Sequence, residues 1–142
     1  MEKPRVYILV RYFLPGYRGG GPIRTIENLL IQLGDEFEFR IITLDRDLGS
    51  SERYPGVIPN RWETVGKAKV YYLSPNLLLP LRIIKLLRAK EASVIYLNSF
   101  FDPVFSIVPS IASKMRLLRN TPVVIAPRGE FSSGAIAIKR TK

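Results

Sequence analysis

The sequence predicts an α/β fold, a parallel sheet of about five strands flanked by helices. Apolar runs alternate with helical patterns along the chain, which is typical of right-handed strand–helix–strand units. The first run, residues 6–10, is short and apolar, as expected for a parallel strand covered on both faces. The expected strands span residues 6–10, 37–44, 68–73, 93–97 and 122–126. The expected helices span residues 22–33, 81–90 and 102–118, and another begins after residue 134.

Three consecutive glycines, Gly19–Gly21, separate the first strand from the first helix. Pro22 suits the first helical position, where its missing N–H costs nothing, and Gly34 suits the end of the helix. Glycine backbone can approach a ligand closely, and a helix N-terminus carries partial positive charge. Two interpretations stay open here, a permissive turn and a site for a phosphate or another anion.

Composition limits the chemistry of the chain. The 142 residues, which fit one domain (1–142), include no cysteine and no histidine. Their absence excludes disulfides, thiolate chemistry, the usual zinc sites and any Ser-His or Cys-His nucleophile. No run is long enough to span a membrane or to form a signal core, and we expect a cytoplasmic protein.

The net charge is +10, and basic residues are in excess after Val104. Such an excess attracts nucleic acid, an anionic membrane or a phosphorylated small molecule. We expect no nucleic-acid partner, because no reader motif and no exposed aromatics interleaved with the basic residues are recognisable. A solvated basic face is the first interpretation. Peripheral contact with an anionic membrane surface, at its inner face, or with an anionic substrate is the second.

Polar residues follow two of the expected strands. Asp45 and Asp47 come after the second strand, where a carboxylate can bond a ribose or hold a divalent cation or simply end the strand. Asn98 follows the fourth strand, at the sheet edge where ligands bind, although it can equally satisfy turn backbone. Residues 48–67 form a long loop, and Trp62 is expected to pack it against the body.

The helix expected over 102–118 starts with Asp102 as its cap and Pro103 in its first position. Pro109 predicts an irregular first turn or a kink. The apolar spacing predicts the following core-facing side chains: Val104, Ile107, Val108, Ile111, Met115 and Leu118.

Two motifs together resemble a known family. The first strand leads into Tyr-Phe-Leu-Pro-Gly-Tyr-Arg-Gly-Gly-Gly-Pro (12–22), and the fifth into Ala-Pro-Arg-Gly-Glu-Phe (126–131). Their order and spacing resemble the N-terminal domain of family 4 retaining glycosyltransferases, as do Leu-Asp-Arg-Asp-Leu-Gly (44–49) and Tyr-Pro-Gly (54–56). The resemblance covers essentially the whole chain.

The resemblance implies one half of a GT-B architecture, in which two Rossmann-like domains face each other across a cleft. This half would hold a glycan or lipid-linked acceptor and present Gly20 and Gly21 to the diphosphate of a nucleotide-sugar donor. The positions of Asn98, Arg128, Gly129 and Glu130 match the cleft, with Asn98 where many relatives carry histidine. Such relatives need no bound metal, which would make Asp45 and Asp47 structural.

The family's C-terminal donor-binding domain has no counterpart within these residues. We therefore expect a fragment of a polysaccharide-building hexosyltransferase that transfers no sugar alone. The alternative is a stand-alone Rossmann-like module that binds a nucleotide or an anion without catalysis. A nicotinamide-dependent oxidoreductase is disfavoured, because Arg24 stands where the third glycine of its fingerprint belongs.

Overall fold

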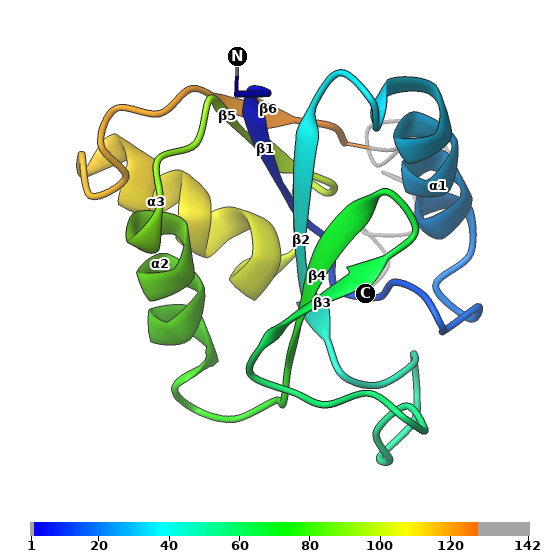
Figure 1. Cartoon of the computed structure of the whole chain (residues 1–142). Helices are drawn as coiled ribbons and strands as arrows, with labels where there is room; N and C mark the ends of the chain where they lie inside the picture. The colour runs from blue at the N-terminus through cyan, green and yellow to red at the C-terminus, as the bar shows by residue number, and fades with distance from the viewer. Residues whose placement is uncertain (1, 128–142) are drawn as a thin grey trace, which may run out of the picture.

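The chain forms a six-stranded sheet with helices on both faces, and the computed structural model describes residues 2–127 (Figure 1). The strands are β1 (Arg5–Leu9), β2 (Glu38–Leu44), β3 (Trp62–Val65), β4 (Ala68–Leu73), β5 (Val94–Leu97) and β6 (Val123–Ile125). Their order across the sheet is β3-β4-β2-β1-β5-β6. All neighbouring pairs are parallel except β3 and β4. The predicted α/β class is confirmed, and the topology is compatible with a Rossmann-like fold.

One face of the sheet is covered by α1 (Gly21–Leu33). The predicted spacing holds, because Ile23, Ile26 and Leu30 are the buried side chains of this helix. They join a core with β1 and β2 residues such as Ile8 and Ile41, which are fully buried. A helix of this kind is stabilised mainly by burial of its apolar stripe against the sheet.

The opposite face is covered by α2 (Leu79–Ala89) and by the helical segment after β5 (Figure 1). The buried side chains of α2 are Leu79, Ile83 and Leu87, spaced four residues apart. They pack into a second core with alternate residues of the strands, among them Tyr7 and Leu9. β1 therefore has a packed layer on each side.

The long loop predicted over 48–67 contains a strand that the sequence interpretation missed. Trp62–Val65 forms β3, which pairs with β4 in an antiparallel hairpin through Gly66, whose φ is +58°. A glycine with positive φ between two short strands is a hairpin signal. As expected, Trp62 packs against the body, with its ring centroid 5.2 Å from that of Tyr71 and 6.2 Å from that of Tyr7.

The segment predicted as one helix over 102–118 forms two helical pieces, and the side chains that it buries differ from the predicted ones. It begins with a wide π-helical turn, η1 (Pro103–Ile107), continues as α3 (Val108–Lys114) and ends before Leu118. Pro109 has no N–H to offer the carbonyl of Phe105, so the preceding turn widens. The prediction that Ile107, Ile111 and Met115 face the core is wrong, since all three are exposed. Phe105 and Ala112 are buried in their place.

Candidate functional site

The strand order creates a switch point beside β1. The chain leaves β1 through α1 toward β2 and β4, and it then crosses back to place β5 on the other side of β1. In open parallel sheets, ligands bind beyond the carboxyl ends of the strands at such a reversal. The strand order alone therefore marks the crevice between β1 and β5 as the candidate site.

A cavity of about 200 Å³ occupies this crevice. Its walls come from the residues after β1, from the turn into α1 and from the segment after β5. Four polar residues, one glycine and one proline from these three segments line it: Arg11, Asn98, Asp102, Ser106, Gly19 and Pro22. Asn98 lines this cavity directly after β5, at the carboxyl edge where the sequence placed it, and it is buried.

The glycine turn lies beside this cavity and opens onto a second one. Gly20 and Gly21 line a neighbouring hollow of about 440 Å³ together with Arg24 and Glu27, so they do not share the cavity of Asn98. Gly20 has a φ of +73°, and a Cβ at Gly20 or Gly21 would meet no atom of residues 2–127 within 4 Å. No other segment of the described chain therefore packs over Gly20 or Gly21.

The amides of the turn are only partly used. The Gly20 N–H donates to the carbonyl of Tyr17 at 3.2 Å, and the Ile23 N–H donates to the carbonyl of Gly20 at 3.1 Å. Within residues 2–127 the Gly21 N–H finds no hydrogen-bond acceptor. The N-terminus of α1 therefore presents a donor and its partial positive charge to the hollow.

Three long-range contacts hold the segment between β1 and this turn. The hydroxyl of Tyr54 donates to the carbonyl of Phe13 at 3.2 Å, and that of Tyr72 donates to the carbonyl of Leu14 at 2.6 Å. Burial raises the pKa of Tyr72 to about 12, so its hydroxyl stays a neutral donor. Sequence reasoning assigned no role to either tyrosine, because nothing local links them to a carbonyl across the fold.

Asp47 provides the third contact. Its carboxylate accepts hydrogen bonds from the N–H groups of Tyr17 at 3.1 Å, Arg18 at 3.2 Å and Leu48 at 2.8 Å. Desolvation alone would raise the pKa of Asp47, but these three backbone hydrogen bonds outweigh it and lower that pKa below its usual range. Asp47 thus anchors the approach to the glycine turn.

An ion pair joins the two sides of the cavity. The guanidinium of Arg11, after β1, donates from Nε to Asp102 Oδ2 at 2.7 Å and from Nη2 to Oδ1 at 2.9 Å. The Asp102 carboxylate also accepts from the N–H groups of Val104 and Phe105 at the start of η1, as its predicted role as cap requires. The side-chain hydrogen bonds to Asp102 raise the pKa of Arg11.

Ser106 leaves one polar atom unsatisfied in the cavity wall. Its side chain is buried, and within the described chain its Oγ has no hydrogen-bond partner. Buried hydroxyls are almost always paired, so an exception at a cavity invites a ligand that supplies the partner. Ser106 was not predicted as a site residue, because no sequence pattern predicts the wide turn of η1 that buries it.

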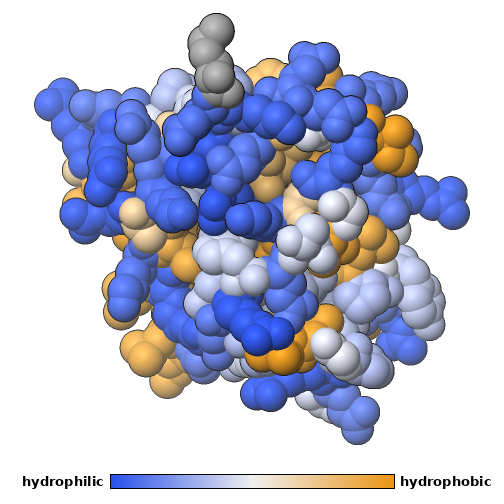
Figure 2. All heavy atoms as spheres, in the orientation of Figure 1, coloured by the Kyte–Doolittle hydropathy of each residue, from blue (hydrophilic) through white to orange (hydrophobic). Residues whose placement is uncertain are grey.

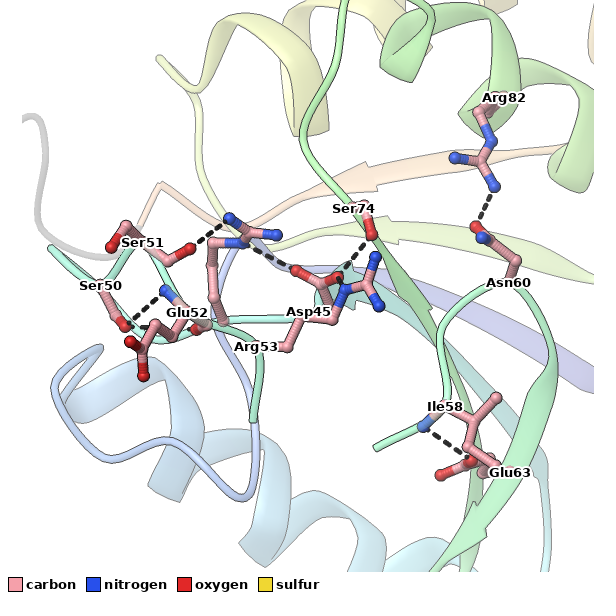
Figure 3. A network of polar contacts seen from close by, with 11 residues as sticks. Asp45, Ser50, Ser51, Glu52, Arg53, Ile58, Asn60, Glu63, Ser74 and Arg82 are labelled. Carbon is pink, nitrogen blue, oxygen red and sulfur yellow. Dashed lines mark hydrogen bonds and ion pairs between the residues drawn. The ribbon is translucent and has the colours of Figure 1, made fainter. Parts of the chain in front are cut away.

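The other predicted carboxylate, Asp45, is used inside the fold (Figure 3). It is fully buried and accepts from Arg46 Nε at 2.8 Å and from Ser74 Oγ at 2.5 Å, and Arg53 Nε lies 3.2 Å away. These partners fasten the loop after β2 to the end of β4. Nowhere in residues 2–127 do three or more acidic side chains gather in a way that could hold a metal ion.

Arg128, Gly129 and Glu130, which the resemblance assigns to the cleft, lie outside the described residues. The strand that precedes them, β6, is paired with β5 in the sheet. Among the described helices, none has the length and apolar character needed to cross a bilayer.

Comparisons with protein-family models, with curated protein sequences and with solved structures find no match to this chain.

We predict that acid loosens the approach to the glycine turn. Because the pKa of Asp47 is lower in the folded chain, its contribution to stability is complete above about pH 3.9, the usual value for Asp. That contribution is lost as the pH falls through the lower, folded-state pKa. In an NMR titration, the amide shifts of Tyr17 and Arg18 should move together with a midpoint below about 3.9.

Asp47→Ala should abolish this titration and increase the fast backbone motion of residues 16–18, as measured by ¹⁵N relaxation. Asp35→Ala serves as the control, because Asp35 pairs with Lys67 elsewhere on the surface. A midpoint at or above the ordinary Asp value would contradict the role given to Asp47.

We also predict that Ser106→Ala stabilises the chain. Removing a buried hydroxyl that has no partner relieves a desolvation cost, so the free energy of unfolding should rise by about 1 kcal/mol. Urea denaturation measures this change, and Ser110→Ala, on the same helical segment, is the matched control. A loss of stability in Ser106→Ala would mean that its hydroxyl is already paired.

Proposed function

We propose that this chain is the acceptor-side half of a retaining glycosyltransferase of GT-B architecture. In this proposal a second Rossmann-like domain closes over the carboxyl edge of the sheet and holds most of the nucleotide-sugar donor. The two domains together transfer a sugar to a glycan or lipid-linked acceptor, as in the building of a polysaccharide. The observation that carries the proposal is the cavity between β1 and β5, with the N-terminus of α1 beside it.

The proposed chemistry fits these residues. Transfer from a nucleotide sugar develops negative charge on the leaving diphosphate, and fixed N–H dipoles stabilise such charge without reorganising. The Gly21 N–H and the α1 terminus supply such dipoles, and the side-chain-free turn lets a diphosphate approach. We assign Gly20 and Gly21 to this contact, on the side of the turn that opens to the neighbouring hollow.

The cavity beside the turn suits the hydroxyl groups of a sugar or an acceptor. Ser106 Oγ is an unused hydrogen-bonding atom in its wall, and Asn98 adds a buried amide. The Arg11–Asp102 pair keeps the two sides of this cavity in a fixed spacing. By the resemblance, Arg128, Gly129 and Glu130 complete the cleft, and the reaction uses no metal.

A titration of the ¹⁵N-labelled chain with UDP, GDP, ADP and inorganic pyrophosphate tests this proposal. A half-site that contacts only the diphosphate should bind all four weakly, at about millimolar concentration, and shift the amides of Gly20 and Gly21. The isolated chain should transfer no sugar from labelled nucleotide sugars.

Two other outcomes would contradict the proposal. Unchanged Gly20 and Gly21 amides at saturating diphosphate would exclude the assigned contact. Tight binding with strong preference for one base would instead identify a stand-alone nucleotide-binding module, since the proposed half-site leaves the base to the other domain.

Gly21→Ala separates binding from stability. Gly21 has no positive φ, and no atom of residues 2–127 lies near its Cβ position, so alanine should stabilise the chain by about 0.4–1 kcal/mol. The added methyl group projects into the proposed diphosphate path and should weaken pyrophosphate binding by about tenfold or more. Gly66→Ala, at the distant hairpin with a φ of +58°, should show the reverse pattern, with lower stability and unchanged binding. Equal binding by Gly21→Ala and the unmodified chain would count against the site.

A further inference from the structure

The beginning of α2 carries apolar side chains on its outward side as well as on its buried side. Leu77, Leu78 and Leu81 are 99%, 59% and 65% exposed, whereas Leu79 and Ile83 of the same segment are buried. Figure 2 shows apolar side chains gathered at the lower left, over this end of α2, with hydrophilic side chains beside them. Three neighbouring exposed leucines are more than the scattered apolar residues of an ordinary surface.

The outward side of α2 changes character along its length. Leu78, Leu81, Lys85 and Arg88 stand three, four and three residues apart, which places them in one line along a helix. All four side chains are exposed. We refer to these four residues together with Leu77 as the α2 stripe. The stripe is apolar at its beginning and cationic at its end, and α2 contains no acidic residue.

We propose that the α2 stripe docks this chain on the surface of an anionic lipid bilayer. Surface-bound helices of this kind bury leucines at the boundary of headgroups and acyl chains while lysine and arginine contact anionic headgroups. The net charge of +10 draws the whole chain toward such a surface. The sequence predicted membrane contact from the basic residues after Val104, whereas the structure points to α2.

Charge complementarity favours a bilayer over a second copy of the chain. If two α2 stripes packed together, Lys85 and Arg88 of one copy would approach those of the other, and like charges at a contact are unfavourable. An anionic bilayer is complementary to both parts of the stripe, because its acyl chains can bury the leucines and its headgroups carry negative charge for the basic residues.

The stripe is separate from the proposed sugar-transfer site. None of its residues lines the cavity between β1 and β5 or the hollow beside the glycine turn. Membrane binding and diphosphate binding can therefore be tested independently, and a negative result for one proposal does not contradict the other.

Co-sedimentation of the full chain with lipid vesicles tests this proposal. We expect binding to equimolar phosphatidylcholine and phosphatidylglycerol, little binding to phosphatidylcholine alone, and weaker binding as salt is raised. Leu77→Ser/Leu81→Ser should lower the partition coefficient by about tenfold or more. Lys85→Gln/Arg88→Gln should lower it by about 30-fold at low salt.

Matched controls replace exposed residues of the same kinds elsewhere. Ile31→Ser changes an apolar side chain of α1 that is 69% exposed, and Lys3→Gln/Lys69→Gln removes two exposed charges from other surfaces. Both controls should bind nearly as well as the unmodified chain, and circular dichroism should show that every variant is folded. If Lys3→Gln/Lys69→Gln bound vesicles as weakly as Lys85→Gln/Arg88→Gln does, total charge rather than the stripe would attract the chain to the membrane.

Two further results would overturn the proposal. One is unchanged vesicle binding by Leu77→Ser/Leu81→Ser. The other is self-association of the unmodified chain that this double variant abolishes while neither protein binds vesicles, because that result would assign the stripe to contact between two copies.

Discussion

Burial of β1 on both faces is the constraint from which the rest of the fold follows. Tyr7 and Leu9 point into one core and Ile8 into the other, and each is at most 1% exposed. A strand without a solvent-facing side needs a helical layer above and below it. Right-handed connections can supply both layers only if the chain turns to opposite sides of β1. The crevice at the carboxyl end of β1 therefore results from the same reversal of chain direction that covers both faces of β1.

Polar contacts between distant segments give this crevice a defined shape. Arg11 and Asp102 join its two sides through two charge-assisted hydrogen bonds, which are among the stronger contacts that a partly buried pair can make. Tyr54, Tyr72 and Asp47 fix the path of the chain from β1 to the glycine turn. A binding site needs such support, because backbone dipoles act on a ligand only when they are held in place.

The sequence predicted the parts of this structure that local patterns encode. Apolar runs located β1, β2, β4, β5 and β6, and the spacing of Ile23, Ile26 and Leu30 predicted the buried side of α1. Two local features were misread. The strand β3 lies in a segment rich in glycine and proline, which the sequence predicts as a loop. The widened turn before Pro109 rotates the following helix away from its expected register.

The candidate site was predictable only where it follows from strand ends. Asn98 was expected at the carboxyl edge and lies there, and Asp102 was expected to cap its helix and does so. The Arg11–Asp102 pair, the tyrosine hydroxyls on the loop carbonyls and the unpaired Ser106 were not predicted. Each depends on segments that meet only in the folded chain or on the π-helical turn, and no local pattern encodes either.

The long reach of the Arg11–Asp102 pair has a consequence for how the chain folds. The two residues are separated by 91 positions, and β1 pairs with β5 over a similar distance in sequence. In contrast, β1, β2 and β4 all lie within the first 73 residues. Contacts that close long loops form slowly, because the chain loses the entropy of loop closure before these contacts contribute any stabilising energy. We expect the half of the sheet around β2 to assemble early during synthesis and the crevice to take shape last, once β5 has left the ribosome.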